Sequence, residues 1–379
     1  MFFPDSFLAS FFPTFLTTDY KRMQIFKYPD LILIEILHNM NYSEIFLMSF
    51  ISKNMKKLVK SYQISRFDRI ESIRYECYPN GQPLVYIHYK SSSERILKIE
   101  ECDEEINDKF QLNISGKMID FRYSDQYQCP VACCQPDDKV YVIKSLHDHF
   151  LDFFGDSVEY HFEAKYGWKS DYFIIPQLQN ISICSIWYYR YGDMKSVENF
   201  FAWSPVFKRV YLFHEPHHQT ENSFGPKSKL WQTDSIKIDQ RNPDAPNVLH
   251  CFKGRQAFLR YGSGATFEIV DFVNRWKSGD VSRLEYLQIE SNLVVEFSYD
   301  PVLNHIGVKQ IDPEKTPPTH SVPKIHIEKD NIPNTDPITS HTYVVRQSDG
   351  RVASILVQGK KFYFGVWDKT EEEFLEMVE

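Results

Sequence analysis

The sequence predicts an α+β protein with several domains: three helices near the N-terminus, then a β-rich region, then a repeating α/β sheet. Three observations lead to this prediction. A strongly apolar helical pattern follows Pro29, short alternating runs begin near Arg66, and helix-like and strand-like runs alternate after Lys139. The chain has 379 residues, of which 42% are hydrophobic and 16% aromatic, so it can bury a large core.

The helical pattern begins at Pro29 and Asp30, which are typical of a helix opening. Ser43 is expected to cap a second apolar helix, and Ser52 to open a basic third helix over residues 54–61. The apolar residues of the first helix are Leu31, Ile32, Leu33, Ile34, Ile36, Leu37 and Met40. Because so short a segment cannot bury this much apolar surface alone, we expect another surface to cover its first two helices.

At these residues the stretch resembles the F-box, the adaptor-binding module of ubiquitin-ligase substrate receptors. Two positions depart from the family pattern, since Tyr28 and Met40 stand where Leu is usual, and both stay apolar. The F-box is assigned to residues 23–65. The residues that carry the resemblance are Pro29, Ile36-Leu37, Ser43-Glu44-Ile45, Ser52-Lys53 and Leu58-Val59-Lys60-Ser61.

The resemblance implies that these helices bind a Skp-type adaptor and, through it, a cullin–RING ligase. The alternative is an ordinary helical subdomain packed on the rest of the protein, because periodicity alone does not distinguish the two. The positions that match the family's apolar adaptor-binding residues are Pro29, Ile32, Leu33, Ile36, Leu37, Met40 and Ile45.

Charge and cysteine content restrict the function further. The formal net charge of -8 disfavours nucleic-acid binding, which needs clustered Lys and Arg, and the basic third helix is interpreted as a solvated face. Seven Cys at irregular spacing indicate reduced thiols rather than a disulfide framework. No apolar run is long enough to cross a membrane. We therefore expect a cytoplasmic protein, with the nucleus as the alternative.

Residues 1–22 are expected to form a flexible extension. Pro4, Asp5 and Pro13 interrupt its apolar run, which also lacks the basic start and small-residue cleavage site of a secretory signal. Met23 stands immediately before the F-box-like stretch, so translation could also start there.

Residues 66–135 are expected to form a small antiparallel sheet. Runs rich in β-branched and aromatic residues are separated by turn signals at Asn80-Gly81, Ser91-Ser92-Ser93 and Gly116. The predicted strands are 70–78, 83–89, 95–100, 109–115 and 118–123.

Residues 136–300 show a repeating rhythm in which a helical run leads through a short loop into a strand. Strand starts recur every 25 to 28 residues over much of this span, as in stacked strand–helix repeats. We interpret the region as leucine-rich-repeat-like, although regular Leu and Asn positions are missing and a plain α/β layer is the alternative. The predicted helices are 143–154, 194–203, 245–252 and 265–276. The predicted strands are 158–162, 181–187, 208–213, 235–238, 256–261 and 284–289.

The last repeat, residues 272–289, adds a second resemblance, to the F-box-associated domain, type 2, of nematode F-box proteins. Its hallmarks are a helix with an aromatic residue and Trp276, a Gly turn, and the strand Leu284-Glu-Tyr-Leu. The family's later Arg-x-x-Asp-Gly-Arg hairpin and aromatic strand match residues 346–351 and 362–367. The residues expected in the core here are Trp276, Tyr286, Phe362 and Trp367.

The remaining segments are assigned from turn and cap signals. Residues 301–341 are rich in Pro, Thr, Asp and Asn and are expected to be a loop or linker with one short strand at 324–328. Residues 342–379 are expected to form a hairpin that turns at Asp349-Gly350 and a short helix capped by Thr370 and Glu373.

Few groups of residues suggest a metal site, a phosphate-binding loop or a catalytic site. Cys129, Cys133 and Cys134, with His147 and His149, lack the second ligand pair of a structural zinc site. The run from His214 to His218 contains Pro216, which prevents a regular helix from aligning ligands, and Gly262-Ser-Gly264 lacks the rest of a phosphate loop. We therefore expect no metal, no cofactor and no catalytic residue.

The sequence thus indicates a non-catalytic substrate receptor of an SCF-type (Skp-cullin-F-box) E3 ubiquitin ligase. The F-box would bind the adaptor, and the C-terminal part would hold an unknown target protein. Two alternatives are an interaction scaffold that works without a ligase and an unrecognised enzyme.

Overall fold

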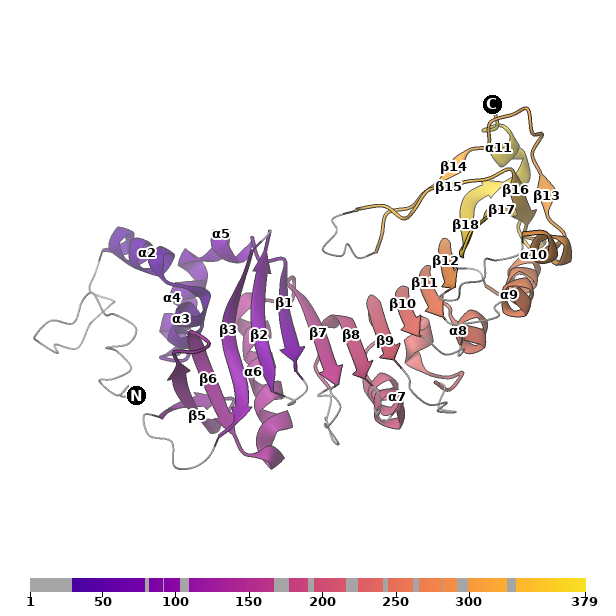
Figure 1. Cartoon of the computed structure of the whole chain (residues 1–379). Helices are drawn as coiled ribbons and strands as arrows, with labels where there is room; N and C mark the ends of the chain where they lie inside the picture. Colours follow the sequence, from indigo (N-terminus) through magenta and orange to yellow (C-terminus); the bar gives the residue numbers. More distant parts are fainter. Residues whose placement is uncertain are drawn as a thin grey trace, which may run out of the picture. The chain divides into compact units, whose positions relative to one another are not determined.

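The computed structural model describes residues 29–78, 82–90, 92–102, 109–166, 177–189, 194–215, 224–240, 245–261, 266–281, 283–291, 299–325 and 332–379. The chain forms two compact units. Unit 1 comprises Met1–Lys165 and Lys169–Ile181, and unit 2 comprises Tyr166–Trp168 and Ser182–Glu379. Each unit has its own helices and its own strands (Figure 1).

Several expected features lie outside the described residues. These are the N-terminal extension 1–22 with Met23 and Tyr28, the turn at Asn80-Gly81, His217-His218 and Gly262-Ser-Gly264. Within the described residues, no helix combines the length and apolar content that a membrane crossing requires.

The helices of unit 1 begin with the three predicted near the N-terminus. Asn41, not Ser43, caps the second helix: its side chain accepts from the Glu44 backbone N–H at 2.9 Å, and Glu44 accepts from the Asn41 backbone N–H at 2.7 Å. The prediction for Ser43 was wrong because the helix starts at Tyr42, two residues before the start at Glu44 that a cap at Ser43 requires. Ser52 caps the third helix as predicted. The helices are α2 (Asp30–Asn39), α3 (Tyr42–Met48), α4 (Lys53–Tyr62), α5 (Ile64–Phe67), η2 (Pro136–Asp138) and α6 (Lys139–Phe154).

The sheet of unit 1 is mixed, not antiparallel as expected. Its order is β7-β1-β2-β3-β6-β5-β4, and the pairs β1–β7 and β3–β6 are parallel. Strand β6 was not predicted, because all of its residues are buried and Pro130 interrupts the expected pattern. The strands are β1 (Ser72–Cys77), β2 (Pro83–Tyr89), β3 (Ser92–Glu101), β4 (Phe110–Ile114), β5 (Lys117–Ser124), β6 (Cys129–Cys134) and β7 (Glu159–Tyr166).

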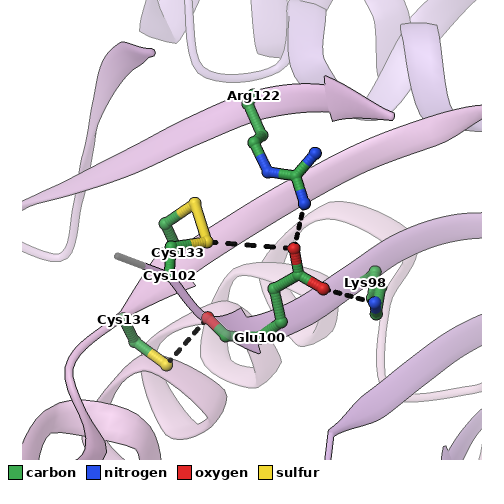
Figure 2. Close-up of a disulfide and its surroundings, with 6 residues drawn as sticks. All are labelled: Lys98, Glu100, Cys102, Arg122, Cys133 and Cys134. Carbon is green, nitrogen blue, oxygen red and sulfur yellow. Dashed lines mark hydrogen bonds and ion pairs between the residues drawn. A yellow bond between two sulfur atoms is a disulfide. The ribbon is translucent and has the colours of Figure 1, made fainter. Parts of the chain in front are cut away.

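A disulfide joins β6 to the end of β3, which corrects the expectation of reduced thiols alone. Cys102 and Cys133 are bonded, with their Cα atoms 5.3 Å apart, whereas Cys77, Cys129, Cys134, Cys184 and Cys251 are free and buried. The parallel pairing of β3 with β6 brings the two cysteines together from positions 31 residues apart. Figure 2 shows the bond beside Glu100, which forms ion pairs with Lys98 and Arg122.

Unit 2 contains the predicted alternation of strands and helices. Its five strands β8 to β12 pair in parallel, and β12 then pairs antiparallel with β18. The strands are β8 (Ile181–Tyr189), β9 (Arg209–Glu215), β10 (Ser235–Gln240), β11 (Gln256–Tyr261) and β12 (Tyr286–Ser291). The helices are α7 (Met194–Trp203), η3 (Lys229–Gln232), α8 (Ala245–Cys251) and α9 (Thr266–Ser278).

One face of these parallel strands forms the core of unit 2. Alternate residues of each strand are buried on the face that the helices cover. Figure 1 shows α7, α8 and α9 on one side of strands β8 to β12. The buried strand residues of this face are Cys184, Ile186, Val210, Leu212, Ile236, Ile238, Ala257, Leu259, Leu287 and Ile289. One row of the opposite face is buried as well: Ile183, Arg209, Ser235, Gln256 and Tyr286.

The segment expected to be a linker contains regular structure. Leu303 and Ile306 recur at helical spacing and are buried in α10, which shows why residues 301–341 are not simply a loop. Lys324 and Ile325, expected to start a strand, are not part of one. The elements here are α10 (Tyr299–Ile306), β13 (Lys309–Gln310), β14 (Thr319–His320) and β15 (Ile338–Thr339).

The C-terminal hairpin and helix form as predicted, from β16 (Thr342–Val345), β17 (Arg351–Gln358), β18 (Lys361–Thr370) and α11 (Glu371–Leu375). The turn uses Gly350 with φ of 71°, a conformation that favours glycine. Of the aromatic residues expected in the core, Trp276, Tyr286 and Phe362 are fully buried. Trp367 is half-buried and donates a hydrogen bond to Ser354 Oγ at 2.9 Å.

Candidate functional site

Helix α2 carries the most exposed apolar side chains near the N-terminal end of the described chain. Pro29 opens the helix with φ of -56° and is exposed. Leu31 is 80% exposed and Ile32 is 45% exposed, while Ile36, one helical turn after Ile32, is half-buried. This helix therefore presents an apolar surface outward, which from here we call the α2 surface: Pro29, Leu31, Ile32 and Ile36.

The opposite side of α2 packs inside unit 1. Leu33 and Leu37 are buried, and Met40 follows the helix in a buried position. Arg66 from α5 holds the end of α2, because its Nη1 donates to the Met40 carbonyl at 2.6 Å. The same guanidinium lies 4.1 Å from the ring centroid of Tyr42, at the start of α3. These contacts fix the direction in which the α2 surface faces.

Helix α3 is covered by the chain itself. Ile45 and Phe46 are 0% exposed, and the Phe46 ring stacks on Phe150 of α6 with centroids 4.7 Å apart. The surface that was expected to cover both helices is therefore, for α3, supplied by the chain itself and not by an adaptor. Its cover comes from a helix about 100 residues later in the sequence, which local pattern cannot reveal.

A buried histidine of α6 joins α3 to the body of unit 1. His149 stacks on Phe50 with centroids 3.9 Å apart, and its Nε2 lies 2.7 Å from Ser49 Oγ. The Ser49 hydroxyl already donates to the Phe46 carbonyl at 2.6 Å, so Nε2 of His149 is the donor in this pair. Burial lowers the pKa of His149 to about 3, with Lys56 adding to the effect.

Helix α4 is held on α6 by charge. Lys56 forms an ion pair with Asp152, and Lys60 Nζ donates to the Asp152 carbonyl at 2.7 Å. The hydrogen bond from Lys56 lowers the pKa of Asp152 below its ordinary value. Lys53 and Lys57 are exposed, so only part of the basic helix is a solvated face.

A second polar contact ties α3 to the sheet of unit 1. The Tyr42 backbone N–H donates to Glu94 Oε1 of β3 at 2.5 Å. Burial raises the pKa of Glu94, although this hydrogen bond acts in the opposite direction. The bond satisfies a donor at the first turn of α3, which the helix itself cannot pair.

The structure divides the seven predicted adaptor-binding residues into two groups. Pro29, Ile32 and Ile36 belong to the α2 surface. The other four are buried within unit 1: Leu33, Leu37, Met40 and Ile45. Leu31, the most exposed apolar residue of this helix, was not among the seven, although its place in the same apolar run was visible in the sequence.

In the part of the chain that the structure describes, no group of three or more His, Cys, Asp or Glu is placed to hold a metal ion. Cys129 and Cys134 lie in β6, and burial raises the pKa of each thiol to about 11, which keeps both protonated at neutral pH. The cysteine-rich stretch is thus a buried strand.

Comparison with known proteins identifies one domain. Residues 29–67 match the model of the F-box domain. The match covers α2 to α5, the helices described above, and F-box domains generally bind a Skp-type adaptor in SCF complexes. No curated protein and no solved structure matches the chain.

Proposed function

We propose that this protein is the substrate-recognition subunit of an SCF-type E3 ubiquitin ligase. The observation that carries the proposal is the F-box at residues 29–67, whose first helix exposes the apolar α2 surface. An exposed apolar surface of this kind is typical of a protein-binding site. The adaptor would cover it and link the chain to a cullin and a RING subunit.

Within this proposal the seven predicted residues have two roles. Pro29, Ile32 and Ile36 would touch the adaptor directly, together with Leu31. The buried residues would hold the helices in the geometry that presents this surface: Leu33, Leu37, Met40 and Ile45.

The mechanism would be proximity without a catalytic residue in this chain. A target held by the receptor has its lysines at high local concentration near the ubiquitin-conjugating enzyme, which is an effective-molarity effect. We further propose that unit 2 is an F-box-associated domain, type 2, of the nematode kind, with a leucine-rich-repeat-like sheet. The parallel β8–β12 array and the hairpin at Asp349-Gly350 support this assignment.

Copurification with a Skp-type adaptor tests the proposal. We expect the double variant Ile32→Asp with Ile36→Asp to lose the adaptor, because each change places an unpaired charge in an apolar interface. Leu37→Asp is a poorer test, since Leu37 is 0% exposed and the variant would disturb the F-box itself. Met118→Asp in β5 is the matched control, because Met118 is 47% exposed and lies outside the F-box. Adaptor binding by the double variant equal to that of the control would refute the proposal.

A ligase-independent scaffold is the alternative that this copurification leaves open. Affinity purification with and without proteasome inhibition should reveal a bound protein that accumulates only when degradation is blocked. Ubiquitination of that protein by a reconstituted ligase would support a receptor, and unmodified binding would favour a scaffold. We propose a cytoplasmic or nuclear location, which imaging of a tagged full chain would check.

A further inference from the structure

The Cys102–Cys133 disulfide of unit 1 lies where a small molecule from solvent can reach it. All seven cysteines are among the described residues, and Cys102 is the one whose side chain is half-buried rather than buried. Cys133 is 7% exposed, and the other five cysteines keep free thiols. In a chain whose thiols mostly stay free, a single reachable disulfide is typical of a bond that opens and closes, not of a permanent scaffold.

A pocket of about 210 Å³ borders the bond. Both bonded cysteines line this pocket, together with the free Cys134 of β6. Its charged lining residues are two lysines and two aspartates: Lys109, Lys117, Asp120 and Asp138. Because the lining carries both signs of charge, it complements a small zwitterionic molecule better than a molecule of a single sign.

Glu100 is placed to accept a hydrogen bond from the reduced form of Cys102. Its Oε1 lies 3.9 Å from Cys102 Sγ, within reach of a thiol proton once the disulfide is open (Figure 2). Lys98 and Arg122 form ion pairs with the same carboxylate, so its charge is already compensated. Opening the bond therefore gives the Cys102 thiol a partner at once.

The bond closes a segment that contains a whole hairpin. Cys102 and Cys133 are 31 residues apart, and β4 and β5 lie between them. Two ion pairs join this region to η2 and the start of α6: Glu101 with Lys139, and Lys117 with Asp138. Because a disulfide restricts the unfolded states of the segment that it closes, we expect the hairpin to open less often when the bond is present.

We propose that Cys102 and Cys133 form a reversible modification site for a small zwitterionic thiol and its disulfide, with glutathione as the probe. In the closing direction the Cys102 thiolate attacks the reagent disulfide, which forms a mixed disulfide and releases one reagent thiolate. The Cys133 thiolate then attacks Cys102 Sγ and releases the second reagent thiolate. Two protein thiols are oxidised, one reagent disulfide is reduced to two thiols that take up the two protons, and opening is the reverse. This inference does not depend on the proposed function.

A thiol–disulfide titration of the full chain tests the inference. The chain is equilibrated with reduced and oxidised glutathione in a series of ratios, quenched with acid, alkylated in denaturant and mapped by peptide mass. We expect the Cys102–Cys133 link to disappear in reducing mixtures and to return in oxidising ones, while Cys134 stays a free thiol throughout. Hydrogen exchange in β4 and β5 should be about tenfold faster in the reduced chain.

Serine variants separate the roles of the two sulfurs. With Cys133→Ser, glutathione should accumulate on Cys102, because the second thiol that resolves the mixed disulfide is gone. With Cys102→Ser, the adduct at Cys133 should form about tenfold more slowly, because Cys133 is only 7% exposed. Cys134→Ser is the matched control, since Cys134 lines the same pocket and is also 7% exposed, and it should leave the titration unchanged.

A comparison of reagents tests the class of ligand. Oxidised glutathione carries ammonium and carboxylate groups, whereas hydroxyethyl disulfide is uncharged. The rate of each with Cys133→Ser, divided by its rate with free cysteine, should be severalfold higher for glutathione. Equal ratios would overturn the assignment of a zwitterionic ligand.

Three results would overturn the site itself. Separate alkylation of Cys102 and Cys133 in every mixture would show that the bond does not form. A bond that opens only after the chain is unfolded would be a permanent structural disulfide. Equal adduct rates at Cys102 and Cys133 would show that exposure to the pocket does not select the reacting sulfur. The first two results are read on the unmodified chain and so do not depend on the folding of any variant.

Discussion

The two units share one construction, a sheet with helices on one face. The side chains on the other face, which we call the outer face, differ in kind between the units. In each unit helices cover one face of the strands, and alternate residues face the other way. On the outer face of unit 1, Lys98 and Glu100 pair with each other, and Arg122 completes the cluster (Figure 2). On the outer face of unit 2, Trp187 contacts Tyr211 and Phe213, with ring centroids 5.0 Å and 5.2 Å apart.

The difference lies in how the side chains of each outer face are paired. Lys98 and Glu100 are only 7% and 8% exposed, and Lys98 also lies 4.0 Å from the Tyr127 ring centroid. Such a cluster gains nothing from an apolar partner, since covering it would only remove water from charges that are already paired. The rings of unit 2 are instead held by contact with one another, through Trp187 with Tyr211 and Phe213. The outer faces of the two units therefore differ in the kind of contact that holds their side chains, ion pairs in unit 1 and ring contacts in unit 2.

The largest effect that we predict is the loss of stability when a ring is removed from the helix-covered face of the sheet, and it should be similar in both units. Phe150→Ala in unit 1 and Trp276→Ala in unit 2 each remove a fully buried ring. We expect each to lower the free energy of unfolding by about 4 kcal/mol, as large-to-small core changes do. Denaturant unfolding of the full chain would measure both. A loss below about 1 kcal/mol at either site would contradict the assigned cores.

The charged cluster of unit 1 should be nearly as sensitive. Glu100→Gln leaves Lys98 and Arg122 without their shared carboxylate in a buried position, and we expect a loss of about 3 kcal/mol. Glu101→Gln is the control, because Glu101 pairs with Lys139 and is 43% exposed, so its loss should stay below about 1 kcal/mol. Equal losses of unfolding free energy for the two variants would contradict the expected difference between a buried and an exposed ion pair. Both values come from urea titrations at neutral pH.

Acid should weaken the attachment of the F-box within unit 1. Burial holds the pKa of His149 at about 3, below the value near 6.5 of an unfolded histidine, so protonation favours the unfolded state. This stability is complete above pH of about 6.5 and is lost as the pH falls toward 3, by up to about 1.4 kcal/mol per pH unit. Lys56 and Asp152 are the charged groups beside the ring.

The variant His149→Gln checks that assignment. It should flatten the dependence of unfolding free energy on pH between 6 and 4 by close to one proton. His147 and His320, whose pKa values are also lowered by burial, would keep part of the slope. A variant as pH-sensitive as the unmodified chain would show that His149 is not the group responsible.

The exposed ion pairs of unit 2 should matter least. Arg260 is 53% exposed at its side chain, so Arg260→Ala should cost no more than about 0.5 kcal/mol. Thermal unfolding at low and at high salt would show the small effect and its screening. A loss comparable to that of Glu100→Gln would mean that ion pairs on the outer face contribute equally to stability in the two units.

Much of the secondary structure was predictable because its signals are local. The helix at 194–203 and the strand at 256–261 were predicted with the bounds that the structure shows, from periodicity and flanking turns. The cap of α11 at Thr370 and Glu373 was visible as a pair three residues apart. Strand β6 escaped prediction, since a fully buried strand shows no alternation.

The candidate site was predictable only in part. The F-box pattern located the right helices, yet Leu37 and Ile45 are buried whereas Ile32 is exposed. All three are apolar and lie in apolar helices, so their sequence pattern does not say which side another part of the chain will cover. Phe150 packs over α3, and no residue close to α3 in the sequence indicates this contact.

The sequence by itself determined the order of helices and strands, most of their ends, and the presence of an F-box. These depend on contacts between residues a few positions apart. Only the tertiary structure decided that Cys102 meets Cys133, that α6 covers α3, and that Trp187, Tyr211 and Phe213 share one face of a sheet. Those facts depend on pairings between distant segments, whose partners are selected by how the whole unit buries its apolar surface.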